Sequence, residues 1–128
     1  METTITHDIR ISVETQYQDS LSHPEQSDFI FAYRVTIENL SIYTVQLLRR
    51  HWDVFDALEG FRTVEGEGVV GLKPCLEPHQ TYSYVSGTNI FCGIGFMEGY
   101  YTMLRTADGT EFDVTIPRFV LQGRMLLN

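Results

Sequence analysis

Apolar and polar residues alternate in several separate segments of this chain, and this period of two constrains the fold more than any other feature. Between Ile5 and Tyr17, the apolar side chains lie on one side of the pattern and the polar ones on the other. The same alternation runs from Asp28 to Asn39, with Phe29, Phe31, Tyr33, Val35 and Ile37 on one side. Successive side chains of a strand point to opposite faces, so both segments predict strands with one buried face.

A third apolar segment, from Ile42 to Phe55, has a less regular period. A helix over Tyr43–His51 is the competing interpretation. The segment begins with Ile42-Tyr43-Thr44-Val45, where β-branched residues predominate, and its neighbours are strands. These two observations favour a strand.

The rest of the chain predicts further strands separated by turn signals. We expect a short strand and a glycine-rich stretch in Phe61–Gly71, a strand that ends at Gly87, and a strand over Phe96–Thr106 that Gly99 interrupts. Asp108-Gly109 is a hairpin signal before the last strand, Glu111–Ile116, and Pro117 should end that strand or mark an edge.

Six to eight short strands with frequent turns predict an all-β fold, an antiparallel β-sandwich of the immunoglobulin or fibronectin type III-like kind. A closed barrel is the structural alternative. The chain has 128 residues and no linker long enough to divide it, so we expect a single domain over residues 1–128.

The net charge of the chain limits the classes of partner that we expect it to bind. The formal net charge is −8, and the basic residues form no run beyond Arg49-Arg50, which argues against nucleic acid and anionic membranes. The first residues do not resemble a signal peptide, and no apolar segment approaches the ~20 residues that cross a bilayer. We therefore expect a cytoplasmic protein without membrane insertion, in which Cys75 and Cys92 are small packed side chains.

The stretch from Gly66 to Gly71 matches G-x-G-x-x-G through Gly66, Gly68 and Gly71. In a dinucleotide fold these glycines precede a helix that holds a pyrophosphate, but Pro74 and Pro78 prevent a helix here. Two interpretations remain. The glycines allow bulges or a close approach of another backbone, or their N–H groups hold an anion despite the nearby glutamates.

Other site chemistry has little support in the sequence. The four histidines form no i,i+2 or i,i+4 pair, and neither C-x-x-C nor an EF-hand-like loop is present. No local pattern pairs a nucleophile with a base. We therefore expect a protein that is not an enzyme and has no cofactor, with a metal site left unknown because ligand spacing for Mg²⁺ or Co²⁺ is missing. The aromatic and methionine residues of Phe91–Met103 should pack in the core, or form a protein-binding patch where they are exposed.

Several motifs in order along the chain resemble the ApaG family. They are Arg50-His51-Trp52, the glycine stretch 66–71, Gly95–Met103 and Gly109–Phe119, and the resemblance covers the chain from Ile9 to its end. It implies a fibronectin type III-like sandwich in a bacterial cytoplasmic protein associated with Co²⁺/Mg²⁺ efflux. Related domains in eukaryotic F-box and polymerase-delta-interacting proteins imply a protein-interaction module.

The family's glycine motif, which has been suggested to bind pyrophosphate or a nucleotide, maps to Gly66, Gly68 and Gly71. The resemblance and the missing catalytic signals together predict a non-catalytic adaptor that supports divalent-cation resistance or efflux through a protein partner. The alternative is a small-ligand protein that holds a pyrophosphate, a nucleotide or a metal–nucleotide complex at the glycine stretch. An edge strand of an open sandwich could also pair with a second copy to form a homodimer.

Overall fold

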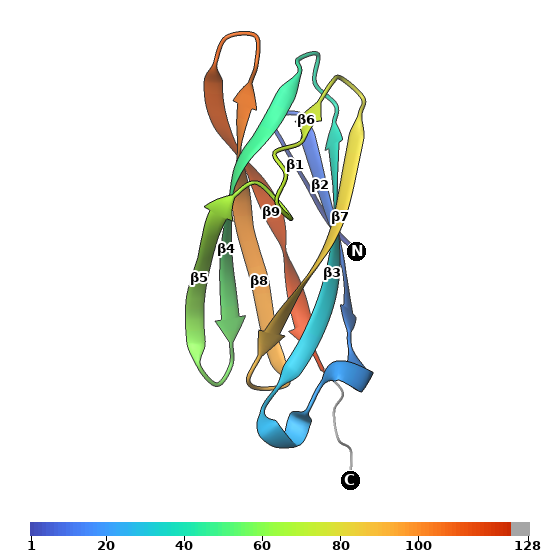
Figure 1. The fold of residues 1–128 in the computed structure, drawn as a ribbon, viewed down its shortest axis with the longest axis vertical. Coiled ribbons are helices and arrows are strands. Elements are labelled where there is room, and N and C mark those ends of the chain that lie inside the picture. The colour runs from blue at the N-terminus through green and yellow to red at the C-terminus, as the bar shows by residue number, and fades with distance from the viewer. Residues whose placement is uncertain (124–128) are drawn as a thin grey trace.

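The computed structural model describes residues 1–123 as two antiparallel sheets packed face to face (Figure 1). The first sheet has the order β1-β2-β3-β7, formed by Glu2–Thr6, Ile9–Tyr17, Phe29–Asn39 and Thr81–Ile90. The second has the order β5-β4-β8-β9, formed by Gly60–Glu67, Val45–Asp56, Ile94–Arg105 and Thr110–Gln122. The short strand β6, Cys75–Leu76, pairs with β4.

The predicted antiparallel sandwich is confirmed, and the closed barrel is wrong because the two sheets keep separate edges. The segment at 43–51 is not a helix. Its residues from Val45 onward begin β4, and a register shift between Leu47 and Arg49 explains the irregular period of the sequence. An extra residue in one strand of a pair is a β-bulge, which reverses the side-chain alternation beyond it.

The predicted strand Ile5–Tyr17 is two strands joined by a tight turn at His7-Asp8. Both turn residues have positive φ, 49° and 62°, and Thr6 pairs with Ile9 across them. The hairpin reverses the chain, so Ile5 is not on the buried side and is 56% exposed. The predicted loop at 18–27 contains two single-turn 3₁₀ helices, η1 (Asp19–Leu21) and η2 (Pro24–Gln26).

Three further boundaries differ from the prediction. Gly87 does not end its strand, since β7 continues to Ile90. Pro117 does not end β9, but the alternative that it marks an edge is confirmed, because β9 is the outermost strand of its sheet and Pro117 is buried at a bulge where β9 has an extra residue opposite β8. Gly99 does not interrupt β8; a Cβ at this position would lie 1.9 Å from the carbonyl oxygen of His51, so its absence lets β4 and β8 approach closely.

The core lies between the sheets and is centred on Trp52. The indole ring contacts Tyr33, Tyr101 and Phe119 with ring centroids 5.4, 6.3 and 5.9 Å away. Aliphatic side chains from the inward faces of both sheets surround these rings, including Ile9, Ile11, Val13, Val35, Ile37, Leu47, Val54, Val114, Ile116 and Leu121. The expectation for the thiols is wrong for Cys75, whose side chain is exposed at the short strand β6.

The two lateral sides of the sandwich are closed differently. On one side, Thr4 donates from Oγ1 to the carbonyl of Thr115, and the N–H of Thr115 donates to Thr6 Oγ1. On the other side, Arg62 on β5 donates from Nη2 to Thr88 Oγ1 and to the carbonyl of Asn89 on β7. In Figure 1, β5 and β7 lie at opposite margins of the view, and the chain between residues 68 and 74 lies between them.

Within residues 1–123, none of the elements is a helix long and apolar enough to span a membrane.

Candidate functional site

The glycine stretch follows β5 and folds into a tight turn rather than a helix start. Val69 and Leu72 exchange two backbone hydrogen bonds of 2.7 and 2.9 Å, with Val70 and Gly71 between them. Both central residues have positive φ, 47° and 77°, as in a type I′ turn. Gly71 adopts this conformation without cost, whereas a β-branched valine is strained by about 1–3 kcal/mol. Such strain is concentrated at functional sites, so it draws attention to this loop.

Gly68 is required by the close packing of the turn. Its φ is +63°, and a Cβ there would lie 2.2 Å from the carbonyl oxygen of Leu72. The sequence interpretation in which a glycine permits close approach of another backbone therefore describes this position. The N–H of Gly68 donates to the carbonyl of Leu48, 2.8 Å away. Together with the two bonds across the turn, this leaves the N–H groups of Gly68, Val69 and Leu72 already occupied.

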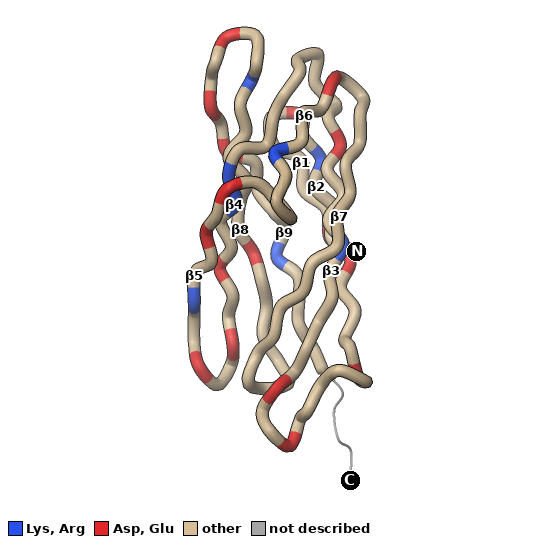
Figure 2. Tube along the Cα trace, viewed as in Figure 1, with Lys and Arg blue, Asp and Glu red and all other residues tan. Residues whose placement is uncertain are grey.

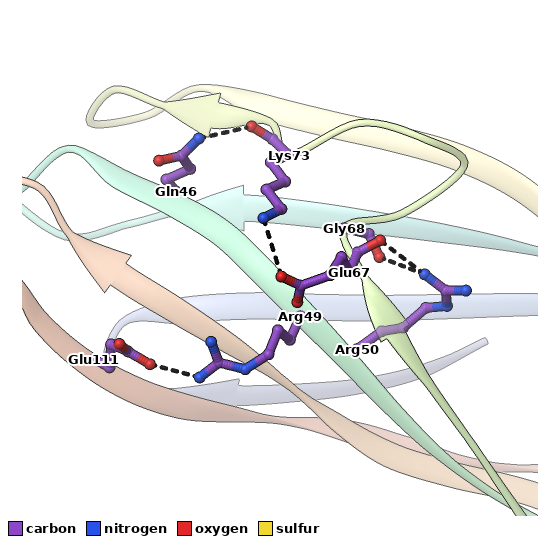
Figure 3. A network of polar contacts seen from close by, with 7 residues as sticks. All are labelled: Gln46, Arg49, Arg50, Glu67, Gly68, Lys73 and Glu111. Carbon is purple, nitrogen blue, oxygen red and sulfur yellow. Dashed lines mark hydrogen bonds and ion pairs between the residues drawn. The ribbon is translucent and has the colours of Figure 1, made fainter.

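At Glu67 and Gly68, the backbone carbonyl groups of this segment face the side chain of Arg50. Arg50 Nη1 donates to the carbonyls of Glu67 and Gly68, at 3.0 and 2.9 Å (Figure 3). Gly66 pairs with Arg50 across β4 and β5, and a Cβ at Gly66 would lie 2.6–2.8 Å from the guanidinium atoms. The glycine thus makes room for the Arg50 side chain, which any other residue would displace.

Arg50 differs from the other basic residues around the loop. Arg49 pairs with Glu111 at 2.5 Å, and Lys73 pairs with Glu67 at 3.2 Å (Figure 3). Within residues 1–123, no carboxylate lies within ion-pair distance of Arg50, and its remaining N–H groups have no hydrogen-bond acceptor. A guanidinium that keeps free donors inside a cleft can bind a carboxylate or a phosphate.

The cleft that contains Arg50 has a volume of about 450 Å³ and lies between β7 and the glycine stretch. Arg50, Trp52 and Glu67 line the side of the second sheet. Tyr84, Val85 and Ser86 of β7, with Tyr33 of β3 and the turn residues 69–71, line the rest. Gly66 is not in this lining; its backbone borders a second hollow of about 300 Å³, which Arg49, Arg50, His51 and Tyr100 also line.

Tyrosine hydroxyl groups give the cleft its second kind of polar contact. Tyr33 and Tyr84 line the cleft, and the Tyr84 hydroxyl is hydrogen-bonded to that of Tyr101, which is fully buried and outside the lining. Burial raises the pKa of Tyr101 and of Tyr84 well above the ordinary value. Burial also raises the pKa of Tyr33, although a hydrogen bond with Ser86 and the positive charge of Arg50 act in the opposite direction. These hydroxyls therefore stay protonated and neutral, and Arg50 supplies the positive charge of the cleft.

A second surface feature is an apolar row on the outer face of the second sheet. The backbone register places one apolar residue from each strand side by side: Phe61 on β5, Phe55 on β4, Phe96 on β8 and Val120 on β9. The rings of Phe55 and Phe96 stack with centroids 5.0 Å apart, and Phe61 packs against both. Phe61 and Val120 are 66% and 54% exposed. We call these four residues the apolar row.

The residues next to the apolar row on the same outer face, around His51 and Tyr100, are polar. The imidazole of His51 stacks on Tyr100 with centroids 4.6 Å apart, and its nitrogens lie 3.2 Å from Asp53 and 3.4 Å from Glu65. Despite these neighbours, the side chains of residues 1–123 contain no group of three or more His, Cys, Asp or Glu arranged to hold a metal ion. The outer face therefore divides into an apolar end and a charged end.

Of the three predicted site residues, Gly66, Gly68 and Gly71, only Gly71 is in the lining of the cleft. Gly68 and Gly71 adopt the positive φ angles of the turn beside the cleft, and the missing side chain of Gly66 leaves space for the Arg50 guanidinium. Sequence reasoning did not identify Arg50 or the tyrosines as a site. In a strict alternation from Leu47, Arg50 would point outward, and the bulge in β4 turns it inward beside Trp52. The irregular period of this segment was the signal that could have located it.

Comparisons with known proteins agree over most of the chain. Residues 19–105 match the family model described as "ApaG domain". The chain is 45% identical to Protein ApaG of Rhodospirillum centenum, over 96% of this chain and 94% of that protein. It is 43% identical to Protein ApaG of Thiobacillus denitrificans over 90% of each. Among solved structures, the putative ApaA protein from Bordetella pertussis superposes with a TM-score of 0.86 at 37% identity, covering 91% of this chain and 94% of that one.

Proposed function

This chain belongs to the ApaG domain family, and on that premise we propose that it is a non-catalytic binding domain that acts in the cytoplasm through a protein partner. We further propose that the partner takes part in resistance to Co²⁺ and Mg²⁺ or in their efflux. The resemblance of the sequence to the family supports this second step. A small domain without a membrane-spanning helix in its described part would influence cation transport through another protein.

The observation that carries the proposal is the apolar row. Four strands each contribute one apolar side chain in direct register, and Ile94 and Leu58 add 52% and 63% exposed side chains nearby in the chain. Scattered exposed apolar residues need no explanation, but a contiguous apolar patch with a polar margin is typical of a protein interface. Aromatic residues are also enriched at such interfaces, and three of the four residues in the row are phenylalanine.

The test is a crosslinked pull-down paired with a growth assay on Co²⁺. We expect Phe61→Ser, alone or with Val120→Ser, to lose a specific partner and to fail to restore cobalt tolerance in a strain that lacks the protein. The matched control is Ile42→Ser, since Ile42 is 82% exposed but lies far from the row in the β3–β4 connection. Retention of the partner by Phe61→Ser, or equal loss in both variants, would contradict the proposal.

A second candidate function is supported by the free donors of Arg50. We propose that a phosphate-bearing small ligand, such as pyrophosphate or a metal–nucleotide complex, binds beside the glycine stretch Gly66–Gly71. The N–H groups of Gly68, Val69 and Leu72 are already hydrogen-bonded, so the Arg50 guanidinium and the hydroxyls of the cleft would be the main groups that hold the anion.

Thermal unfolding tests this candidate with pyrophosphate and with Mg²⁺ plus ATP as probes. A ligand at ~100 times its dissociation constant stabilises the folded state by about 2.7 kcal/mol. We expect the shift in Tm to disappear in Arg50→Gln and to persist in Arg49→Gln, which makes the same charge change on the neighbouring outward side chain. The absence of any shift at millimolar pyrophosphate would reject the candidate. Gly68 is unsuitable for this test because its substitution disturbs the turn itself.

A further inference from the structure

We propose that β7 is a docking strand: an extended segment of a partner protein pairs with its free edge and places an acidic side chain in the cleft at Arg50. This surface is on the β5–β7 side of the sandwich and is separate from the apolar row. The inference goes beyond the proposed function, because each surface can fail without the other.

The backbone hydrogen bonds show which residues of β7 face away from the sheet. The carbonyl of Gln80 accepts from Asn39, so Gln80 points toward β3, and alternate residues after it do the same. The carbonyl of Asn89 faces the opposite way and accepts from Arg62, which agrees with this alternation. The backbone N–H and C=O groups that face outward without a backbone partner in the described structure therefore belong to Thr81, Ser83, Val85, Gly87 and Asn89, and of these only the Asn89 carbonyl accepts from a side chain, that of Arg62.

The free edge of β7 lacks the features that protect edges from pairing. Its ten residues contain no charged residue and no proline, and Figure 2 shows the β7 trace without blue or red. Proteins protect an edge with charge, proline, short length or a covering element. Within residues 1–123, the other edge strands have such protection: β1 has five residues and is joined to β9, β6 has only two residues, β5 carries Arg62, Glu65 and Glu67, and β9 carries Glu111, Asp113, Pro117 and Arg118.

The cleft at Arg50 lies directly beside this edge. Tyr84 and Ser86, the inward side chains of β7, form part of its lining. A segment that adds to β7 as a new strand would point alternate side chains to the same inward side. A carboxylate among them would meet the free N–H donors of Arg50, and charge-assisted bonds of this kind are the strongest that a side chain can make here.

Charge also identifies the occupant as a different protein rather than a second copy of this chain. Two copies paired through β7 would place no carboxylate from residues 81–90 beside either Arg50. An extended segment of a partner that carries an acidic side chain can pair its backbone with the β7 edge and bind the Arg50 guanidinium through its carboxylate.

The experiment uses synthetic peptides with the folded chain labelled with ¹⁵N. The probe is acetyl-TVTETVT-amide, whose valines and glutamate share one face of a strand. The comparison peptides replace the glutamate by lysine, or carry N-methyl groups on the pairing edge. We expect shifts of the Thr81, Ser83, Val85 and Gly87 amides, affinity about tenfold weaker for the lysine peptide, and no binding of the methylated one.

Two variants locate the contacts. Arg50→Gln should make the glutamate peptide bind about tenfold more weakly, while Arg49→Gln should leave its affinity unchanged. Val85→Pro removes only an outward N–H and should abolish binding; should it fold poorly, Val85→Lys adds a charge at the same half-exposed position and should also abolish binding.

Several results would overturn the proposal. They are shifts that map to β5 or to the apolar row, equal binding of the glutamate and lysine peptides, or no shift at millimolar peptide. N-acetylglutamate amide separates a bound strand from a bound carboxylate. If it binds as tightly as the heptapeptide, the edge contributes nothing and the docking strand is rejected.

Discussion

The edges of the two sheets are joined by different contacts on the two lateral sides of the sandwich. On the β1–β9 side, Thr4 and Thr6 reach across to the carbonyl and the N–H of Thr115, so side-chain hydroxyls satisfy an edge backbone. On the β5–β7 side, a single arginine, Arg62, crosses near one end, and above it lies the cleft around Arg50.

This difference separates a side that stabilises the fold from a side that is available for binding. Unpaired backbone groups on an edge strand invite pairing with another chain, and natural proteins usually block them. The β1–β9 side is blocked by hydrogen bonds between Thr4, Thr6 and the backbone of Thr115. The β5–β7 side retains an uncharged strand, a strained turn at Val70 and a guanidinium with free donors. Four variants test this difference between the two sides.

The largest effect is expected at the turn above the open side. In Gly68→Val, the positive φ and a clash with the Leu72 carbonyl together should destabilise the fold by about 4 kcal/mol. Gly71→Ala is the control, since it has positive φ but open space around its Cβ, and it should cost about 1–2 kcal/mol. Urea unfolding of both variants measures the difference. Equal losses would mean that conformation alone, not packing against Leu72, makes Gly68 necessary.

The next effect concerns Asp56, which holds the lower end of the open side together. Its carboxylate is 1% exposed, and it accepts from the N–H groups of Leu58 at 2.9 Å and Phe91 at 2.5 Å. We expect Asp56→Asn to lose about 2 kcal/mol at pH 7, because the amide offers only one acceptor oxygen to these donors. Glu59→Gln, in the same turn but exposed, should change stability by less than about 0.5 kcal/mol.

The same carboxylate gives a pH dependence with a defined sign. Burial acts to raise the pKa of Asp56, but hydrogen bonds from the Phe91 and Leu58 N–H groups, the Cys92 thiol and the Glu59 N–H outweigh it, so the pKa lies below the ordinary value. The stabilisation is therefore complete above about pH 4 and is lost as the pH falls through the lower pKa of the folded state. Urea titrations from pH 7 to pH 2 should show the wild-type advantage over Asp56→Asn shrinking only below about pH 4. A constant difference would contradict this assignment.

On the closed side, the hydroxyls of Thr4 and Thr6 can be removed with little change of shape. The double variant Thr4→Val/Thr6→Val should lose about 1–2 kcal/mol, since two hydrogen bonds to the Thr115 backbone disappear. Thr3→Val removes only a hydroxyl contact to Ser12 within one sheet and serves as the control. Thermal unfolding should place the double variant clearly below Thr3→Val. Indistinguishable Tm values would mean that the threonines do not close this side.

The smallest effect is expected for Arg62→Met, which removes the bridge on the open side. The partly exposed contacts to Thr88 and Asn89 should contribute about 0.5–1 kcal/mol. Hydrogen exchange should become faster for β7 amides while the β1–β9 side stays protected. A stability loss larger than that of the threonine double variant would reverse the comparison, because one arginine would then close its side more firmly than the threonines close theirs.

The sequence predicted the class of fold because period-two alternation in Phe29–Ile37 and its neighbours is a local property of strands. Prediction from the sequence was wrong in two situations. At some places a turn lies inside a segment that still alternates, and at others a bulge interrupts the alternation of a continuous strand. The hairpin at His7-Asp8 and the bulge that accommodates Pro117 are two such places, since each depends on a partner strand. The motif Gly66–Gly71 was visible in the sequence, but the function of each glycine was not.

Residue patterning and ordered motifs were sufficient to predict an all-β sandwich of the ApaG family from the amino-acid sequence. The inward direction of Arg50, the position of Gly66 against its guanidinium and the uncharged edge at β7 became visible only in the folded structure. These features depend on strand register and on which strands lie at the margins of a sheet. Contacts between distant residues set both, so no local pattern records them.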